Sequence, residues 1–213
     1  MDDAEARRLI QRLRQHAGRT YAAEAGITLR DTPMPLFQLM VLCMLASKPI
    51  DASIAMHAAR ELFRAGLRTP RAVLAANRQT MIDAFARAHY VRYDESSASR
   101  LTELATRVND DYRNDLRTLA RVSKPDVRSA KQLIKQFTGI GDTGSDIFLR
   151  EVQDVWPWVR PYFDKRALDS AEQLGLPRDP EKLASLTGRV IAPLAAALVR
   201  VSLDDDVRQR IAG

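Results

Sequence analysis

The stretch of sequence that decides the fold is KQLIKQFTGIGDTG, residues 131–144. Its last six letters fit the pattern G-x-G-x-x-G, which in dinucleotide-binding proteins follows a β-strand and opens a helix. Here the residues before the turn, Ala130, Ile134 and Phe137, recur at helical intervals, and the residues after it are helical in pattern too. The segment is therefore predicted to be two helices joined by a tight Gly-Ile-Gly turn, which argues against dinucleotide binding.

The turn has features that suit an anion. Gly139 and Gly141 allow left-handed backbone angles and close approach to a ligand, and the free N–H groups that open the second helix attract negative charge. Residues 121–135 hold five basic side chains and one acid. Asp142 and Asp146 would repel a phosphate unless they point away or cap the helix. Spacing alone leaves two interpretations open, a DNA phosphate site or an ordinary helical turn capped by glycine.

The rest of the chain is also predicted to be helical, because no stretch shows the alternation of a β-strand. Thr32 to Ser47 carries no charge and is apolar nearly all round, which predicts a buried helix too short for a membrane span of roughly 20 residues. Asn109 to Lys124 is expected to be a polar linker. The predicted helices are Asp3–His16, Pro35–Ala46, one between Asp51 and Gly66, a short one from Pro70, Gln79–Arg87, Glu95–Val108, Arg128–Phe137, Thr143–Val152, Lys165–Leu174 and Val190–Val201.

Composition excludes several classes of protein. The 213 residues are 46% hydrophobic, enough for a core, and the formal net charge of +6 is compatible with a polyanionic partner without requiring one. Cys43 is the single cysteine, so an internal disulfide, a cysteine-ligated iron–sulfur cluster and a zinc ribbon are excluded. The three histidines are far apart, and we expect no metal and no other cofactor. The acidic N-terminus resembles no signal or transit peptide, which predicts a cytoplasmic protein without membrane contact.

The hairpin and the residues after it resemble the helix–hairpin–helix DNA glycosylase superfamily, whose best-known member is endonuclease III. In that family a Leu-Pro-Gly-Val/Ile-Gly hairpin precedes a helix, and further along the chain an aspartate opens another helix that ends in Leu-Gly-Leu. Here Gly139, Ile140 and Gly141 match the hairpin, Asp164 matches the aspartate, and residues 174–176 read Leu-Gly-Leu. The resemblance spans about residues 32–176, and it implies an all-α fold of two lobes.

Two further segments extend the resemblance. Residues 46–51, ASKPID, are similar to the family's motif at the end of its second helix, with Lys48 where a glutamine reaches into the DNA. Residues 90–93, YVRY, fall where the family has a loop that wedges the duplex. The resemblance, taken with the basic lead-in to the hairpin, implies the following DNA-binding residues: Gly139, Ile140, Gly141, Thr143, Lys135, Lys131, Lys48, Arg92 and Tyr93.

The chain departs from the family pattern at the chemical step. The lysine that bifunctional members use to form a Schiff base is replaced by Thr143, whose hydroxyl cannot form an iminium with the sugar. The resemblance then implies a monofunctional site containing Asp164 and Thr143, in which the Asp164 carboxylate stabilises the cationic sugar and activates water. Spacing alone favours a different interpretation, in which Asp164 is the N-cap of the helix that follows it, and it is the resemblance that favours the catalytic role.

These observations predict a two-lobed, all-α protein, with residues 34–152 in a barrel-like lobe that carries the hairpin and residues 1–33 plus 153–213 in a second lobe. The predicted function is monofunctional removal of a damaged or mismatched base from duplex DNA by a monomer. One alternative is a catalytically inactive DNA-binding protein that keeps the hairpin. Another is a lyase that uses Lys48 or Lys165 in place of the missing lysine.

Overall fold

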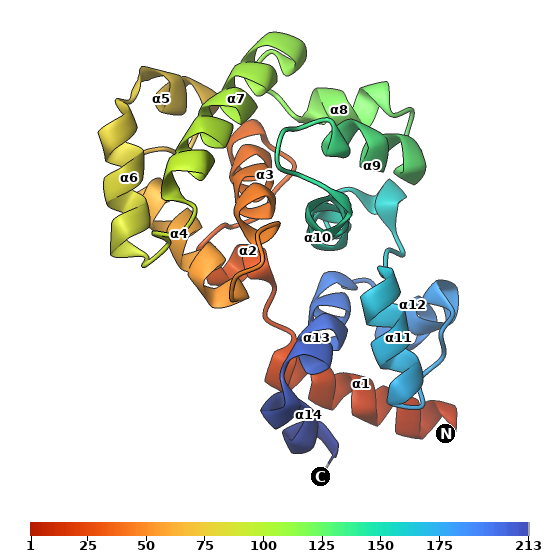
Figure 1. The fold of residues 1–213 in the computed structure, drawn as a ribbon. Helices are drawn as coiled ribbons and strands as arrows, with labels where there is room; N and C mark the ends of the chain where they lie inside the picture. The colour runs from red at the N-terminus through yellow and green to blue at the C-terminus, as the bar shows by residue number, and fades with distance from the viewer. Residues whose placement is uncertain (213) are drawn as a thin grey trace. The chain divides into compact units, whose positions relative to one another are not determined.

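The computed structural model describes residues 1–212, and within these residues every regular element is a helix, as the sequence predicts (Figure 1). The chain divides into two compact units. Unit 1 comprises Met1–Tyr21 together with Leu149–Gly213, of which the structure describes all but the last residue, and unit 2 comprises Ala22–Phe148. Two helices continue across the divisions along the chain, α2 (Tyr21–Glu24) and α10 (Asp142–Val152).

Unit 2 is built around the apolar helix predicted near residues 35–46. This helix, α3, is buried from Pro35 to Leu45, and it packs against α4 and α7 (Figure 1). Because this helix is buried on all sides, its sequence is apolar all round rather than along one stripe. The helices of this unit besides parts of α2 and α10 are α3 (Pro33–Ala46), α4 (Ala52–Arg64), α5 (Pro70–Ala75), α6 (Arg78–Arg87), α7 (Asp94–Tyr112), α8 (Arg117–Val122) and α9 (Val127–Lys135).

A carboxylate joins α4 to α6 inside unit 2. Glu61 is buried, and its two oxygens accept hydrogen bonds from Arg64 Nη1 at 2.6 Å and from Arg87 Nε at 3.0 Å. His57 Nε2 lies 3.8 Å from the same carboxylate. The bond from Arg87 lowers the pKa of Glu61 below its ordinary value of 4.5, against the opposing effect of burial.

This lowered pKa predicts an acid-dependent loss of stability. Because the carboxyl is more acidic in the folded state, its contribution is complete above the unfolded pKa and disappears as pH falls through the lower folded pKa. We expect Glu61→Gln to unfold at a lower temperature than the wild type at pH 6, and this difference to shrink as the pH is lowered from about 4.5. Thermal unfolding followed by circular dichroism from pH 6 to pH 3 measures it. A difference that does not change over this range would contradict the assignment, and Glu103→Gln on the exposed face of α7 is the matched control.

Unit 1 packs its N-terminal helix against the C-terminal ones. Leu9, Ile10 and Leu13 lie on one face of α1, as the sequence predicts, and they are buried in a core that includes residues of α13. Helices α1 and α13 pack against each other (Figure 1). It begins with a complete capping box, in which Asp2 and Glu5 each accept the other's backbone N–H. The helices of this unit are α1 (Asp3–Ala17), η1 (Pro157–Val159), α11 (Lys165–Gln173), α12 (Pro180–Thr187), α13 (Ala192–Leu203) and α14 (Asp205–Ala212).

The prediction of a polar linker from Asn109 to Lys124 was wrong. Helix α7 continues to Tyr112, and α8 forms within the same stretch because Leu116 and Leu119 are buried. These two leucines are too few to show a helical period among so many charges. No sequence pattern predicted the short helices α2, α12 and α14 either.

The predicted lobes and the observed units have different boundaries. The units divide after residues 21 and 148, against predicted divisions after residues 33 and 152. Residues 22–32 belong to unit 2 because Ala22, Ala25 and Ile27 are buried there and Arg60 of α4 donates to the carbonyl oxygen of Glu24.

No single described helix has both the length and the apolar composition to cross a membrane, although α12 and α13, bent by 115° at their junction, would meet the length and composition criteria as a pair.

Candidate nucleic-acid interface

The predicted helix, tight turn and helix are present in unit 2. Gly139 has φ +87°, a left-handed angle that favours glycine, and the turn is held by Phe137 and Ile140, both buried. The Phe137 ring stacks on Tyr112 with 5.7 Å between centroids. A Cβ added at Gly141 would meet no atom within 4 Å, so the backbone of the turn is open to a ligand at this residue.

The two lysines predicted to bind phosphate are paired with acids of the hairpin. Lys131 Nζ lies 2.5 Å from Asp146 Oδ1, and Lys135 Nζ lies 2.8 Å from Asp142 Oδ1. The hydrogen bond from Lys135 lowers the pKa of Asp142. The acids therefore neutralise the lysines instead of standing free to repel a phosphate, and DNA contact by these lysines remains a prediction.

Thr143 is exposed in the first turn of α10, and the residue after it anchors the hairpin. A Cβ added at Gly144 would clash with Ser47 Oγ and would lie 3.1 Å from the carbonyl oxygen of Cys43. Ser47 Oγ in turn donates to that same carbonyl at 2.7 Å. The first turn of α10 is thus packed against the end of α3, directly beside Lys48.

Lys48 lies beside Arg92 and Tyr93 although it is distant from them in sequence. Lys48 Nζ lies 5.1 Å, and Arg92 Cζ 5.3 Å, from the centre of the Tyr93 ring. Both distances are within the range of cation–π attraction. Since Lys48 follows the residue that touches Gly144, the two cations, the aromatic ring and the hairpin form one continuous region of unit 2.

The loop that carries Arg92 and Tyr93 is held by a buried tyrosine. The Tyr90 hydroxyl lies 3.4 Å from the Leu45 carbonyl oxygen and 3.2 Å from Ser97 Oγ, and its burial raises its pKa. Val91, the next residue, is 61% exposed. Val91 lies within the segment 90–93 that the resemblance places at the duplex, but it is not among the predicted DNA-binding residues.

Asp164 lies in unit 1 and caps α11, as the sequence allowed. Its Oδ1 accepts the Ala167 N–H at 2.9 Å, and its Oδ2 is paired with Arg150 Nη1. The side chains of Asp164 and Arg150 are only 6% and 4% exposed. The cap is therefore confirmed, while the catalytic role of Asp164 remains a prediction.

Arg150 belongs to a buried charged cluster in unit 1. Its guanidinium lies 5.6 Å from the centre of the Tyr21 ring, and the Tyr21 N–H donates to Glu151 Oε1 at 3.1 Å. Burial works to lower the pKa of Arg150, but Asp164 and Glu151 outweigh it, and the pKa is raised. The guanidinium is thus permanently charged and compensates the Asp164 carboxylate.

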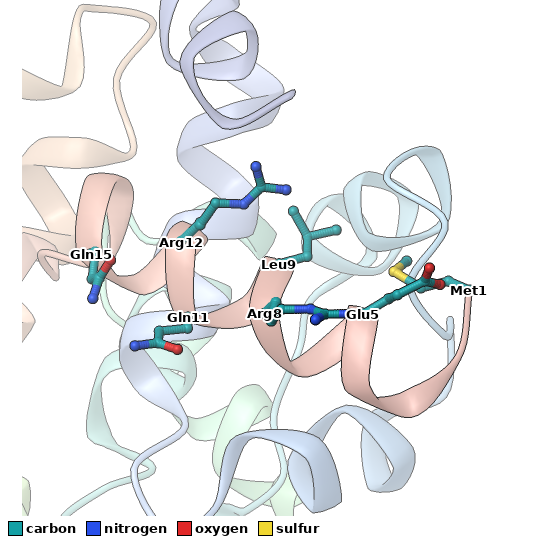
Figure 2. Close-up of a pocket in the computed structure, with 7 residues that line it drawn as sticks. All are labelled: Met1, Glu5, Arg8, Leu9, Gln11, Arg12 and Gln15. Carbon is teal, nitrogen blue, oxygen red and sulfur yellow. The ribbon is translucent and has the colours of Figure 1, made fainter. Parts of the chain in front are cut away.

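The cavity shown in Figure 2 has a volume of about 740 Å³ and lies along α1 in unit 1. None of the predicted site residues lines it. Its lining consists of Met1, Glu5, Arg8, Leu9, Gln11, Arg12 and Gln15.

Within residues 1–212, no group of three or more histidine, cysteine, aspartate or glutamate side chains is placed to hold a metal ion. Thr143 and Asp164 belong to different units. No protein-family model matches the chain, and searches of curated proteins and of solved structures found no significant match.

Proposed function

We propose that this protein binds duplex DNA through unit 2 and removes a damaged or mismatched base by monofunctional hydrolysis of its N-glycosidic bond. The observation that carries the proposal is the cluster of Lys48, Arg92 and Tyr93 beside the glycine hairpin. The two cations attract the phosphate backbone. Val91, which lies between Tyr90 and Arg92 in the sequence, is exposed and has the apolar character of side chains that are inserted between base steps. Such insertion helps to extrude a nucleotide from the stack.

In the proposed reaction, water forms a bond to C1′ of the sugar while the bond from C1′ to the base nitrogen breaks and its electron pair leaves with the base. The proton that the water loses passes to the departing base, so the products are a C1′ hydroxyl and a neutral base. Positive charge develops on the sugar, and a fixed carboxylate stabilises it. Asp164 is the proposed carboxylate, because it is oriented by the Ala167 N–H at the start of α11. Thr143 offers no amine, so no Schiff base forms at the hairpin.

The Arg150–Asp164 pair favours a second candidate function, DNA binding without base removal. Both oxygens of Asp164 are engaged, one by the backbone and one by a buried guanidinium. A positive charge in contact with the carboxylate offsets the negative potential that a cationic sugar requires. In this candidate the hairpin region still binds DNA, and Asp164 serves the stability of unit 1.

A panel of duplexes, each with one oxidised, alkylated or deaminated base or one mismatch, tests the proposal. We expect the wild type to release a base from at least one duplex, seen as strand breaks only after alkali treatment, and to form no covalent complex with borohydride. Binding with a steep salt dependence but no release from any duplex would support the second candidate. A borohydride-trapped complex would instead indicate a lyase that uses Lys48 or Lys165.

The role of Asp164 needs a variant that lacks the carboxylate and still folds. Arg150→Met/Asp164→Ser keeps a helix-capping hydroxyl and removes both charges of the pair together. We expect this double variant to bind duplex DNA as the wild type does and to lose base release. Base release at the wild-type rate by the double variant would show that Asp164 is not the catalytic carboxylate.

A further inference from the structure

The side chain of Arg100, which is not among the predicted DNA-binding residues, lies against the hairpin. Arg100, in α7, is partly exposed, and its Cδ, Nε and Nη1 atoms lie 2.8, 3.3 and 3.4 Å from the position that a Cβ of Gly139 would occupy. Any larger residue at 139 would displace this arginine. The missing side chain at Gly139 therefore lets the guanidinium of Arg100 lie directly on the turn.

A second arginine on the same face of α7 provides a comparison. Arg107 lies seven residues later, and its guanidinium donates to the carbonyl oxygen and to Oε1 of Gln136 at 2.5 and 2.8 Å. It also forms an ion pair with Asp111 at 3.2 Å and lies 5.3 Å from the Phe137 ring centre. The hydrogen bonds of Arg107 thus hold the end of α9 against α7.

Arg100 has none of these bonds. Within the described residues it makes no hydrogen bond and no ion pair, so its donors are available to a ligand. Lys131 and Lys135, the cations expected at this turn, are bound to Asp146 and Asp142. Unlike Lys131, Lys135 and Arg107, Arg100 forms no ion pair with a carboxylate within the described residues.

We propose that Arg100 binds a DNA phosphate at the hairpin, at the place where Gly139 and Gly141 expose the backbone of the turn. A guanidinium presents several N–H donors in a plane and can hold a phosphate through two of them. The contact would position the duplex without reading its sequence. This inference rests on the proposed binding of duplex DNA by unit 2, and it names the residue that supplies the positive charge there.

Arg100→Gln tests the inference in the full-length protein, with an undamaged duplex oligonucleotide titrated at several KCl concentrations. We expect roughly tenfold weaker binding near physiological salt, the size of one charge-assisted hydrogen bond. The slope of log K against log [salt] should become less steep by about 0.9, the value for one phosphate. The melting temperature should not change, because Arg100 makes no hydrogen bond or ion pair within the described chain.

Arg71→Gln is the matched control, since Arg71 is an exposed arginine of α5 in the same unit and its loss changes the net charge equally. An equal loss of affinity in both variants would overturn the inference, because it would show a general effect of charge. Wild-type affinity and slope in Arg100→Gln would overturn it while leaving the proposed function standing. A lowered melting temperature in Arg100→Gln would assign Arg100 to packing of the hairpin. Absence of duplex binding by the wild type would overturn both.

Discussion

Replacing Asp164 with serine is expected to lower the free energy of unfolding by about 3–5 kcal/mol, the cost of removing the carboxylate that is hydrogen-bonded to a buried charge. Serine keeps an oxygen for the Ala167 N–H, so the loss does not come from the helix cap. It comes from Arg150, whose side chain is 4% exposed and whose Nε already lacks a hydrogen-bond partner within the described chain. A guanidinium cannot release its proton near neutral pH, so the charge stays buried.

The reciprocal change, Arg150→Met, is expected to cost less. The Ala167 N–H at the N-terminus of α11 still stabilises the negative charge of Asp164 when Arg150 is removed. The double variant Arg150→Met/Asp164→Ser removes both charges and should recover most of the stability lost by Asp164→Ser alone.

Urea denaturation of the wild type, the two single variants and the double variant measures the coupling between Arg150 and Asp164. The losses of the single variants should not add in the double variant. Additive losses would show that the two side chains do not stabilise each other. This measurement also decides how any loss of base release in an Asp164 variant is interpreted, because an unfolded protein and an inactive one give the same result in an activity assay.

Replacing Tyr93 with alanine is expected to weaken binding to duplex DNA by about 1–2 kcal/mol, or roughly five- to thirtyfold. The ring holds Lys48 and Arg92 in place, and its loss frees two long cationic side chains that would have to be ordered again on binding. The backbone carbonyl of Tyr93, which accepts the Ser97 N–H in the first turn of α7, is unaffected by the substitution.

Tyr93→Phe is the matched variant, because it keeps the ring and removes only the hydroxyl. It should bind as the wild type does, and both variants should keep the wild-type melting temperature to within a few degrees. Fluorescence anisotropy with a labelled duplex at fixed salt gives the comparison. If Tyr93→Ala bound DNA as tightly as Tyr93→Phe, the cluster of Lys48, Arg92 and Tyr93 would have no part in binding.

The helices whose sequences carry a clear period or a long uncharged apolar run were predictable. The stripe of Leu9, Ile10 and Leu13 and the uncharged stretch from Thr32 to Ser47 each predicted a helix that the structure contains. Helix α8 could not be predicted, because Leu119 is its single buried residue and Leu116 is buried at its N-cap, too few to show a helical period. Helix α12 lies among prolines and charges with only Leu183 and Leu186 buried, so it too lacked a readable period.

The candidate site was predictable in part. Because glycine spacing and helix capping are local properties, the sequence by itself determined the helical hairpin around Gly139 and the cap formed by Asp164. Only the tertiary structure decided that Arg150 neutralises Asp164, that the hairpin's own acids bind Lys131 and Lys135, and that Arg100 lies on the turn. These are electrostatic contacts between different helices, and their partners depend on how the helices pack, which the spacing of residues along one helix does not reveal.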